Sequence, residues 1–223
     1  MNRRCVKKTV KSGTAETKER ILDTAERLFA DRGFEATSIR DITSAAEVNL
    51  ASINYHFRTK QELIAAVFIR RVGPINQRRL ELLAEIEQKT GQKPPTVEAL
   101  IEAMILPAAA TGLCKEQGSD TFLQLTGRFF SEPNVEIDQL IHAKFQKMMS
   151  RFTAAFLRVL PGLTEEELYW RLKFTFGALH HVLLTLNKQD STRSHPGKRL
   201  AGAELVQRLV AFAAAGIKAP ASH

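Results

Sequence analysis

Residues 38–63, SIRDITSAAEVNLASINYHFRTKQEL, carry three helix-start signals in close succession. Capping-box patterns begin at Ser38 and at Thr59, each with an acidic residue three positions later that can satisfy a free backbone N–H group. Between them, Asn49 can cap a short helix over residues 50–57. The stretch therefore predicts two short helices joined by a tight turn, followed by a longer helix. This arrangement is typical of a helix-turn-helix, which places the start of its second helix in the major groove of DNA.

The positive charge of the chain is concentrated around this stretch. The full sequence carries 32 Lys and Arg against 24 Asp and Glu, a net charge of +8. Residues 1–79 hold 16 of the basic and 9 of the acidic residues, which is a surplus of seven. This asymmetry favours a polyanionic partner for the N-terminal third alone. Residues 1–13 contain no acid and are either a solvated, disordered arm or a phosphate-binding arm.

Length and composition exclude several classes of protein. A chain of 223 residues is long enough for one compact fold or two small domains. Hydrophobic residues make up 44% and charged residues 25%, which is an ordinary globular composition. The longest apolar run is too short to cross a bilayer, no secretion signal is visible, and two cysteines cannot form a disulfide framework. We therefore expect a cytoplasmic protein without a membrane segment.

Helical periodicity extends along nearly the whole chain. The first helix is capped by Thr14 and ends at Gly33, which can adopt the left-handed conformation of a helix C-terminus. The helix that starts at Lys60 meets Gly73-Pro74, where we expect a kink or a break because proline removes a backbone donor. Further helices are predicted at residues 96–113, 119–131, 134–160, 164–187 and 200–217. The fold is predicted to be all-α.

The outward positions of the second short helix suit contact with DNA. Ala51 and Ser52 are small enough to allow close approach, and Asn54 can pair with adenine. Tyr55 and His56 carry donors that can reach phosphate oxygens. Each has a structural alternative, since Tyr55 could be a packing residue and His56 an ordinary surface histidine.

The helix starts themselves carry the same ambiguity. Ser38, Asn49 and Thr59 are sufficiently explained as caps. Lys60 lies in the first turn of its helix, where a cation opposes the helix dipole. A cation at that position makes sense if a phosphate group approaches it.

Three stretches in this region, ILDTAERLF (21–29), GFEATSI (33–39) and NYHF (54–57), are followed by Lys60, Glu62 and Leu63. At these spacings they resemble the DNA-binding domain of the TetR (tetracycline-repressor) family of bacterial one-component regulators. The resemblance implies a homodimer with an N-terminal helix-turn-helix and a variable helical region. It divides the chain into a basic arm (1–13), a DNA-binding domain (14–64) and a ligand-binding and dimerisation domain (65–223).

The resemblance also implies roles for individual residues, some facing the DNA backbone and others the bases. The full set of predicted DNA contacts is Thr37, Ser38, Arg40, Asn49, Ala51, Ser52, Asn54, Tyr55, His56 and Lys60. One position departs from the family pattern, because Glu47 stands where the family usually has glycine. If this residue adopts a positive φ, a non-glycine side chain costs on the order of 1 kcal/mol there.

The C-terminal two thirds are rich in phenylalanine at helical spacing, which is typical of a core but also suits a ligand cavity with a few polar groups. The candidate lining residues are Phe122, Leu125, Phe129, His142, Met148, Phe152, Phe156, Phe176 and His180. The histidines 142, 180 and 181 lack the spacing of a metal site, so no metal or other cofactor is expected. The last helix mixes large and small apolar residues, which suits either a dimer face against the helix at 164–187 or a buried terminal helix.

Within this region, Ser131-Glu132-Pro133 and parts of residues 169–180 resemble a TetR subgroup that senses fatty acids, acyl thioesters or other lipophilic molecules. The leading hypothesis is a ligand-responsive regulator, by family habit a repressor, whose dimer binds a near-palindromic operator in double-stranded DNA. A non-specific architectural DNA-binding protein is an alternative. A helical enzyme is the weakest hypothesis, because no nucleophile motif or phosphate-binding glycine loop is present.

Overall fold

The computed structural model of the protein describes residues 13–113, 119–187 and 202–220, and every regular element within these ranges is a helix. The all-α prediction is therefore confirmed. The predicted N-terminal arm lies outside the described residues up to position 12. The helices are α1 (Gly13–Arg32), α2 (Ile39–Ala45), α3 (Leu50–His56), α4 (Lys60–Thr90), α5 (Val97–Leu113), α6 (Ser119–Ser131), α7 (Val135–Val159), α8 (Glu165–Asn187) and α9 (Gly202–Lys218). Across the described ranges, no helix has the length and apolar character needed to span a membrane.

Local sequence signals explain the short helices of the N-terminal unit, which comprises residues 13–67. The Ser38 capping box is complete, with the Ser38 and Asp41 side chains each bonded to the other residue's backbone N–H. The second box is formed only in part: the Thr59 hydroxyl accepts from Glu62 N–H at 3.1 Å, but the Glu62 carboxylate accepts from Arg58 N–H at 2.9 Å, one residue before the predicted partner. The starts of α2 and α4 therefore lie at the positions that their caps predict.

The first helix differs slightly at its start. It begins at Gly13, and Thr14, the predicted cap, lies inside its first turn. Its end is as expected, because Gly33 adopts a φ of 89° and the Phe34 ring turns back to pack edge-on against Phe29, with 5.6 Å between ring centroids. This turn sets the angle between α1 and α2.

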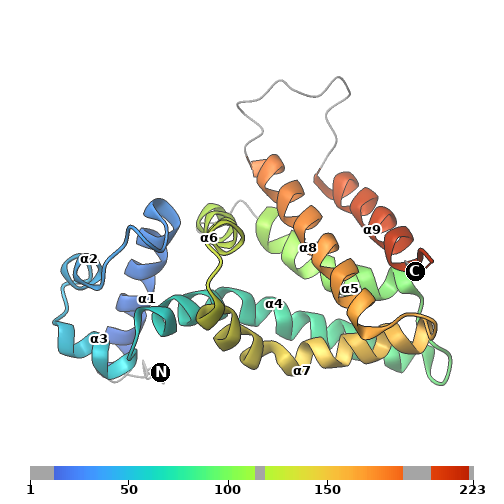
Figure 1. Ribbon diagram of the computed structural model, residues 1–223, viewed down its shortest axis with the longest axis horizontal. Helices are drawn as coiled ribbons and strands as arrows, with labels where there is room; N and C mark the ends of the chain where they lie inside the picture. The colour runs from blue at the N-terminus through green and yellow to red at the C-terminus, as the bar shows by residue number, and fades with distance from the viewer. Residues whose placement is uncertain (1–12, 114–118, 188–201, 221–223) are drawn as a thin grey trace, which may run out of the picture.

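The molecule is built around two hydrophobic cores joined along α4 (Figure 1). The first core lies among α1, α2, α3 and the first turns of α4, and the second lies among α5, α7, α8, α9 and the rest of α4, with Phe122 and Leu123 added from α6. The first core extends past the predicted boundary at residue 64, because it takes in Val67, Leu125 of α6 and Ile137 of α7. In the chain as folded, α6 therefore packs on the N-terminal unit.

Of the kink or break expected at Gly73-Pro74, the break is wrong, since α4 runs without interruption from Lys60 to Thr90 with Pro74 inside it, and the kink stays a prediction. A proline inside a helix costs about 3 kcal/mol, so other contacts must hold the helix together. Just before it, Arg70 and Arg71 both bind the buried carboxylate of Glu26 on α1, at 2.5 and 2.6 Å. These ion pairs and the two cores on either side of Pro74 hold the helix in one piece.

Candidate nucleic-acid interface

The outward face of α3 lies on the surface of the N-terminal unit. Ile53 and Phe57 are buried and pack α3 into the first core, which confirms their predicted side of the helix. Ala51, Asn54 and Tyr55 are exposed, with 77% of Tyr55 accessible. A tyrosine retained for packing would be covered, so the packing interpretation of Tyr55 is wrong for the folded chain. This face therefore carries side chains that folding of the chain does not use.

Hydrogen bonds between its own side chains and backbone stabilise the first turn of α3. Asn49 Oδ1 accepts from the backbone N–H of Ser52 at 2.8 Å and from the Ser52 hydroxyl at 2.9 Å, which confirms Asn49 as the cap. His56 is half-buried, and its ring packs edge-on against the Tyr55 ring with 5.0 Å between centroids. Asn54 and Tyr55 are thus presented by a helix whose first turn is fixed.

An open pocket of about 420 Å³ separates α3 from the first turns of α1. Its lining residues are Gly13, Thr14 and Thr17 of α1 together with Asn49, Ala51, Ser52, Tyr55 and His56. The first described turn of α1 therefore lies beside the predicted contact residues of α3.

Thr37 is not part of this surface. Its side chain is fully buried, and its hydroxyl donates to the backbone carbonyls of Gly33 at 2.9 Å and Leu28 at 3.2 Å. These bonds hold the α1–α2 turn against the end of α1. The predicted DNA contact through the Thr37 side chain is therefore wrong. The residue instead stabilises the α1–α2 turn behind the interface.

The two predicted contacts at the start of α2 differ from each other. The Ser38 hydroxyl donates to Asp41 at 2.6 Å, and this bond, with a second from the Ser38 backbone N–H, holds the pKa of the Asp41 carboxyl below its usual value. Arg40 is exposed on α2. Arg40 is therefore the residue at this position with a cationic side chain available to a partner.

The turn between α2 and α3 contains Glu47, which stands where the family usually has glycine. Glu47 has a φ of 52°, so the condition that the sequence left open is met and the side chain stands in a left-handed conformation. Its N–H donates to Ser44 O at 3.3 Å, and Val48 N–H donates to Thr43 O at 3.0 Å. This pair of bonds is a Schellman motif, which requires a left-handed residue at the position that Glu47 occupies. The turn keeps the helix-turn-helix geometry although it lacks glycine.

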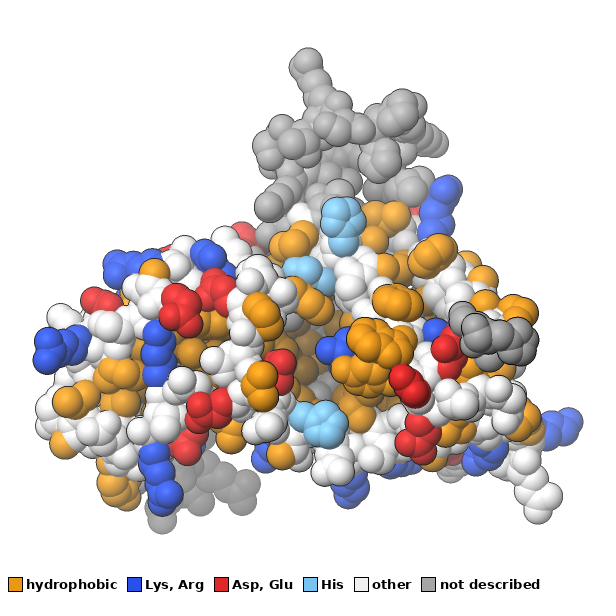
Figure 2. Space-filling view, in the orientation of Figure 1, with side chains coloured by type: hydrophobic (Ala, Val, Ile, Leu, Met, Phe, Trp, Pro, Cys, Tyr) orange, Lys and Arg blue, Asp and Glu red, His pale blue; other side chains and the backbone are white. Residues whose placement is uncertain are grey.

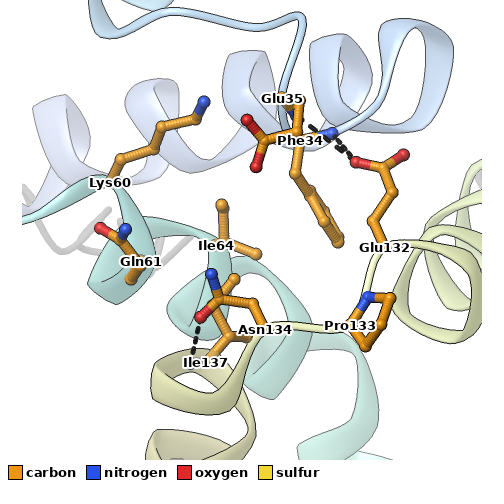
Figure 3. Close-up of a pocket in the computed structure, with 9 residues that line it drawn as sticks. All are labelled: Phe34, Glu35, Lys60, Gln61, Ile64, Glu132, Pro133, Asn134 and Ile137. Atoms are coloured by element: carbon orange, nitrogen blue, oxygen red, sulfur yellow. Dashed lines mark hydrogen bonds between the residues drawn. The ribbon is translucent and has the colours of Figure 1, made fainter.

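A second pocket, of about 300 Å³, lies between the N-terminal unit and the α6–α7 connection (Figure 3). Figure 3 shows Lys60 extending from the first turn of α4 toward the α1–α2 turn, with Glu132 on the opposite side of the pocket. The Glu132 carboxylate accepts from the backbone N–H of Phe34 at 2.7 Å and of Glu35 at 3.4 Å. A residue of the C-terminal region therefore caps the turn that precedes α2.

Neighbouring side chains reinforce this contact, which we call the Glu132 junction. Arg128, one helical turn earlier on α6, donates to Glu132 at 3.2 Å and to the carbonyl of Asp31 at 3.2 Å. The Phe129 ring packs against Phe34 and Phe68, at centroid distances of 5.0 and 4.0 Å. The sequence offered only the Arg128–Glu132 spacing as a signal, and that spacing indicates a pair within one helix rather than a partner 98 residues away.

The nine predicted ligand-lining residues are not brought together. Phe122, Met148, Phe152 and Phe156 lie in the second core, with Phe176 packed against it. Three others lie elsewhere, because Leu125 and Phe129 pack in the first core and His142 is exposed on α7.

His180 is half-buried on α8, where its ring contacts Phe130 of α6 with 4.8 Å between centroids. Burial lowers the pKa of His180, with the charge of the adjacent His181 as a smaller cause. The predicted lining therefore reduces to the residues of the second core and His180.

A surface of exposed aromatic side chains covers the outer side of α8 and α9. It comprises Tyr169, Trp170 and Phe174 of α8 and Phe212 of α9, each at least half exposed. Figure 2 shows apolar side chains gathered over α8. Clusters of exposed aromatics on a folded chain are typical of protein interfaces. The terminal helix therefore has one face buried in the second core, while its other face is exposed and its role as a dimer face stays a prediction.

Comparison with known proteins matches both parts of the chain. A family model of bacterial regulatory proteins of the tetR family matches residues 21–67, and a model of the tetracyclin repressor-like C-terminal domain matches residues 102–216. The chain is 25% identical over 129 residues to the HTH-type transcriptional repressor KstR2 of Rhodococcus jostii, covering 58% of this chain and 63% of that protein. With the uncharacterized HTH-type transcriptional regulator YerO of Bacillus subtilis it shares 34% identity over 80 residues, 36% of this chain and 26% of that protein. It thus spans less than two thirds of these relatives.

Solved structures resemble the fold over nearly its whole length. A TetR family transcription regulator from Marinobacter aquaeolei superposes with a TM-score of 0.62 at 16% identity, covering 91% of this chain and 95% of that one. The regulator FadR from Bacillus subtilis, in complex with stearoyl-CoA, superposes with a TM-score of 0.55 at 15% identity, covering 89% and 98%. At these identities the likeness establishes the architecture.

Proposed function

This chain belongs to the tetracycline-repressor family of bacterial regulatory proteins, and on that premise we propose that it is a cytoplasmic, ligand-responsive repressor that binds a specific DNA operator. The observation that carries the proposal is the exposed face of α3, with Asn54 and Tyr55 held outward by a capped helix. Asn54 is placed to read a base, and Tyr55 and Lys60 to contact phosphates. No catalytic step is assigned to the chain.

The aromatic surface of α8 and α9 supports a homodimer as the DNA-binding unit. A second copy of the chain presents the same surface, so a two-fold axis through Trp170 and Phe174 would cover both. The dimer then carries two α3 helices, and a near-palindromic operator would hold its half-sites about one turn of DNA apart, roughly 34 Å. Burying four aromatic side chains per chain removes apolar area from water and stabilises the pair.

The second core supports a small lipophilic effector as the signal. The structure of FadR that resembles this chain was determined with stearoyl-CoA, a molecule with a long apolar body. Such a ligand releases DNA if it binds the dimer with misplaced α3 helices more tightly than the DNA-binding form. The Glu132 junction and the Phe129 packing are the contacts through which a shift of α6 would reach the N-terminal unit.

The proposal is tested by selecting bound duplexes from a random pool and measuring the affinity of three variants for them. Asn54→Ala should change which base is preferred at one position of each half-site. Lys60→Ala should weaken all sequences alike and reduce the slope of log affinity against log salt by about one. Lys89→Ala, at the far end of α4, is the matched control and should change neither quantity.

The selection also separates this function from its alternative. A regulator enriches near-palindromic sites, whereas a non-specific architectural protein enriches no sequence and binds all duplexes with the same strong salt dependence. Absence of enrichment, together with an Asn54→Ala variant that behaves as wild type, would overturn the proposal.

A further inference from the structure

Three charged side chains are buried in the described parts of the chain, and one of them differs from the others. Glu26, 2% exposed, binds both Arg70 and Arg71. Arg171, 8% exposed, binds Glu167 at 2.8 Å and the carbonyls that end α9. Arg79, 7% exposed, has no carboxylate partner among the residues that the structure describes.

The groups that bind Arg79 within the described chain are neutral. Its Nε donates to the backbone carbonyl of Met104 on α5 at 2.8 Å, and one terminal nitrogen donates to Asn76 Oδ1 at 2.7 Å. The guanidinium lies over the Phe176 ring of α8, 5.3 Å from its centroid. A guanidinium has five N–H donors, so these bonds use only part of its capacity. Its second terminal nitrogen is left for another acceptor.

Burial without a counter-charge is costly for this group. Burial lowers the pKa of Arg79 to about 10, which still leaves the side chain cationic at neutral pH. Proteins pair buried charges with opposite charges because the lost hydration is otherwise not replaced. The neutral carbonyl, amide and ring contacts replace part of that hydration, and no charge on the described chain balances the cation.

We propose that Arg79 binds an anionic group, a carboxylate or a phosphate, at one end of an otherwise apolar effector. The apolar part is provided for by the second core, in which Met104 and Phe152 are buried and Phe176 is partly exposed. Figure 2 shows the surface hollowed between α6 and α8, with apolar side chains inside the hollow. This assignment rests on the proposed function, because it names the chemical class of the effector.

Arg79 lies on the helix that joins the two cores. A ligand anion at Arg79 would contact α4 directly and would also bear on α5 and α8, to which the guanidinium is already joined through Met104 and Phe176. The same helix begins at Lys60, beside the predicted DNA contacts. Binding at this position therefore acts on the element that the two parts of the molecule share.

The test compares wild type with Arg79→Gln, Arg79→Met and Arg78→Met in the full chain. Glutamine keeps an N–H donor for the Met104 carbonyl and removes the charge, whereas methionine removes both. Arg78, the neighbouring residue on α4, is exposed and pairs with Glu81 and Glu85, so Arg78→Met is the matched control. Probes are decanoate, decyl phosphate, decanol and decyltrimethylammonium, each with hexyl and hexadecyl homologues, titrated by calorimetry below micelle formation and without DNA.

At one chain length or more, wild type and Arg78→Met should bind the carboxylate or the phosphate at least tenfold more tightly than the alcohol and should reject the ammonium. Both Arg79 variants should lose that preference. Comparing the carboxylate probes with the phosphate probes distinguishes which of the two anionic groups Arg79 binds. Equal affinity for alcohol and anion, an anion preference that survives in both Arg79 variants, or no binding of any probe to wild type would overturn the assignment.

A second measurement tests whether Arg79 is merely structural. In urea unfolding without ligand, Arg79→Met should leave the midpoint unchanged or raise it, because it removes an unbalanced charge. Arg171→Met should lower the midpoint, because the α9 carbonyls lose the donor that satisfies them. Equal losses in the two variants would show that Arg79 is fully compensated and would overturn the assignment. The proposed function is tested separately, by measuring whether the Arg79 variants bind selected operator DNA in the absence of ligand.

Discussion

The N-terminal unit (residues 13–67) and the C-terminal region (residues 97–220) are both helical, but their backbone ends find partners at different distances along the chain. In the N-terminal unit, Ser38, Asn49 and Thr59 each bond to a residue three positions away. In the C-terminal region, Arg171 satisfies carbonyls at the end of α9 that are 45 to 49 residues away. Local caps also start α5, α7 and α8, at Thr96, Asn134 and Thr164, so the helix starts of both regions are readable from sequence. The end of α9 depends instead on the tertiary structure.

The two regions meet where a distant bond serves a local turn. Glu132 of the C-terminal region caps the α1–α2 turn of the N-terminal unit, and Phe129 completes its core. On this comparison, α6 stabilises the N-terminal unit, although in sequence it belongs to the C-terminal region. Two substitutions, at Phe129 and Glu132, test this point, and a third, at Glu47, tests the local side of the comparison; they follow in order of decreasing effect.

The largest effect is expected at Phe129. Phe129→Ala should lower the free energy of unfolding by about 2–3 kcal/mol, somewhat less than a fully buried phenylalanine, because contacts with Phe34 and Phe68 are lost. The control is Phe130→Ala, at a position that is 55% exposed, which should cost less than about 1 kcal/mol. Urea unfolding measures both variants. Equal losses would contradict a special role for Phe129.

A smaller effect is expected at the Glu132 junction. Glu132→Ala should cost about 1–2 kcal/mol, because the partly buried N–H of Phe34 loses its acceptor. Glu132→Gln keeps an acceptor and should cost less. Hydrogen exchange at the Phe34 amide, followed by NMR, should be faster in the alanine variant. Unchanged protection there would show that the junction does not hold the turn in solution.

The smallest effect is expected at Glu47, a residue whose surroundings are entirely local. Glu47→Gly should be neutral or should raise stability by up to about 1 kcal/mol, since relief of left-handed strain is partly offset by the flexibility that glycine adds to the unfolded chain. Glu47→Ala keeps a Cβ atom and should bring no such gain. Thermal unfolding compares the two variants, and a clear loss in the glycine variant would contradict the strain at this turn.

The limits of prediction from sequence follow the same division. The helix starts at residues 39, 50 and 60 follow from caps that lie within a few residues, whereas the conformation at Glu47 was left open by the sequence. The starts of α5, α7 and α8 and the ends of α6, α7 and α9 lie within about two residues of prediction, because their apolar periodicity and their punctuation are also local. What could not be predicted is which core a helix face joins, so Leu125 and Phe129 were placed in the wrong region.

The candidate site shows the same pattern. The exposed positions of α3 were predicted from helix periodicity, whereas the burial of Thr37 depends on carbonyls at the end of α1. The helix does not break at Pro74. Ion pairs between α4 and α1 help to hold it together, and such tertiary contacts cannot be read from the sequence around a proline. Arg79 could not be singled out either, because a buried and an exposed arginine look alike in sequence.

The central claim is that the exposed face of α3 reads a specific DNA sequence. Its most direct test is the affinity of the full chain for a selected near-palindromic duplex and for a shuffled duplex of the same length and composition, measured by fluorescence anisotropy at about 150 mM salt. The account predicts a ratio of about a thousandfold or more in favour of the selected duplex. A ratio near one would contradict it.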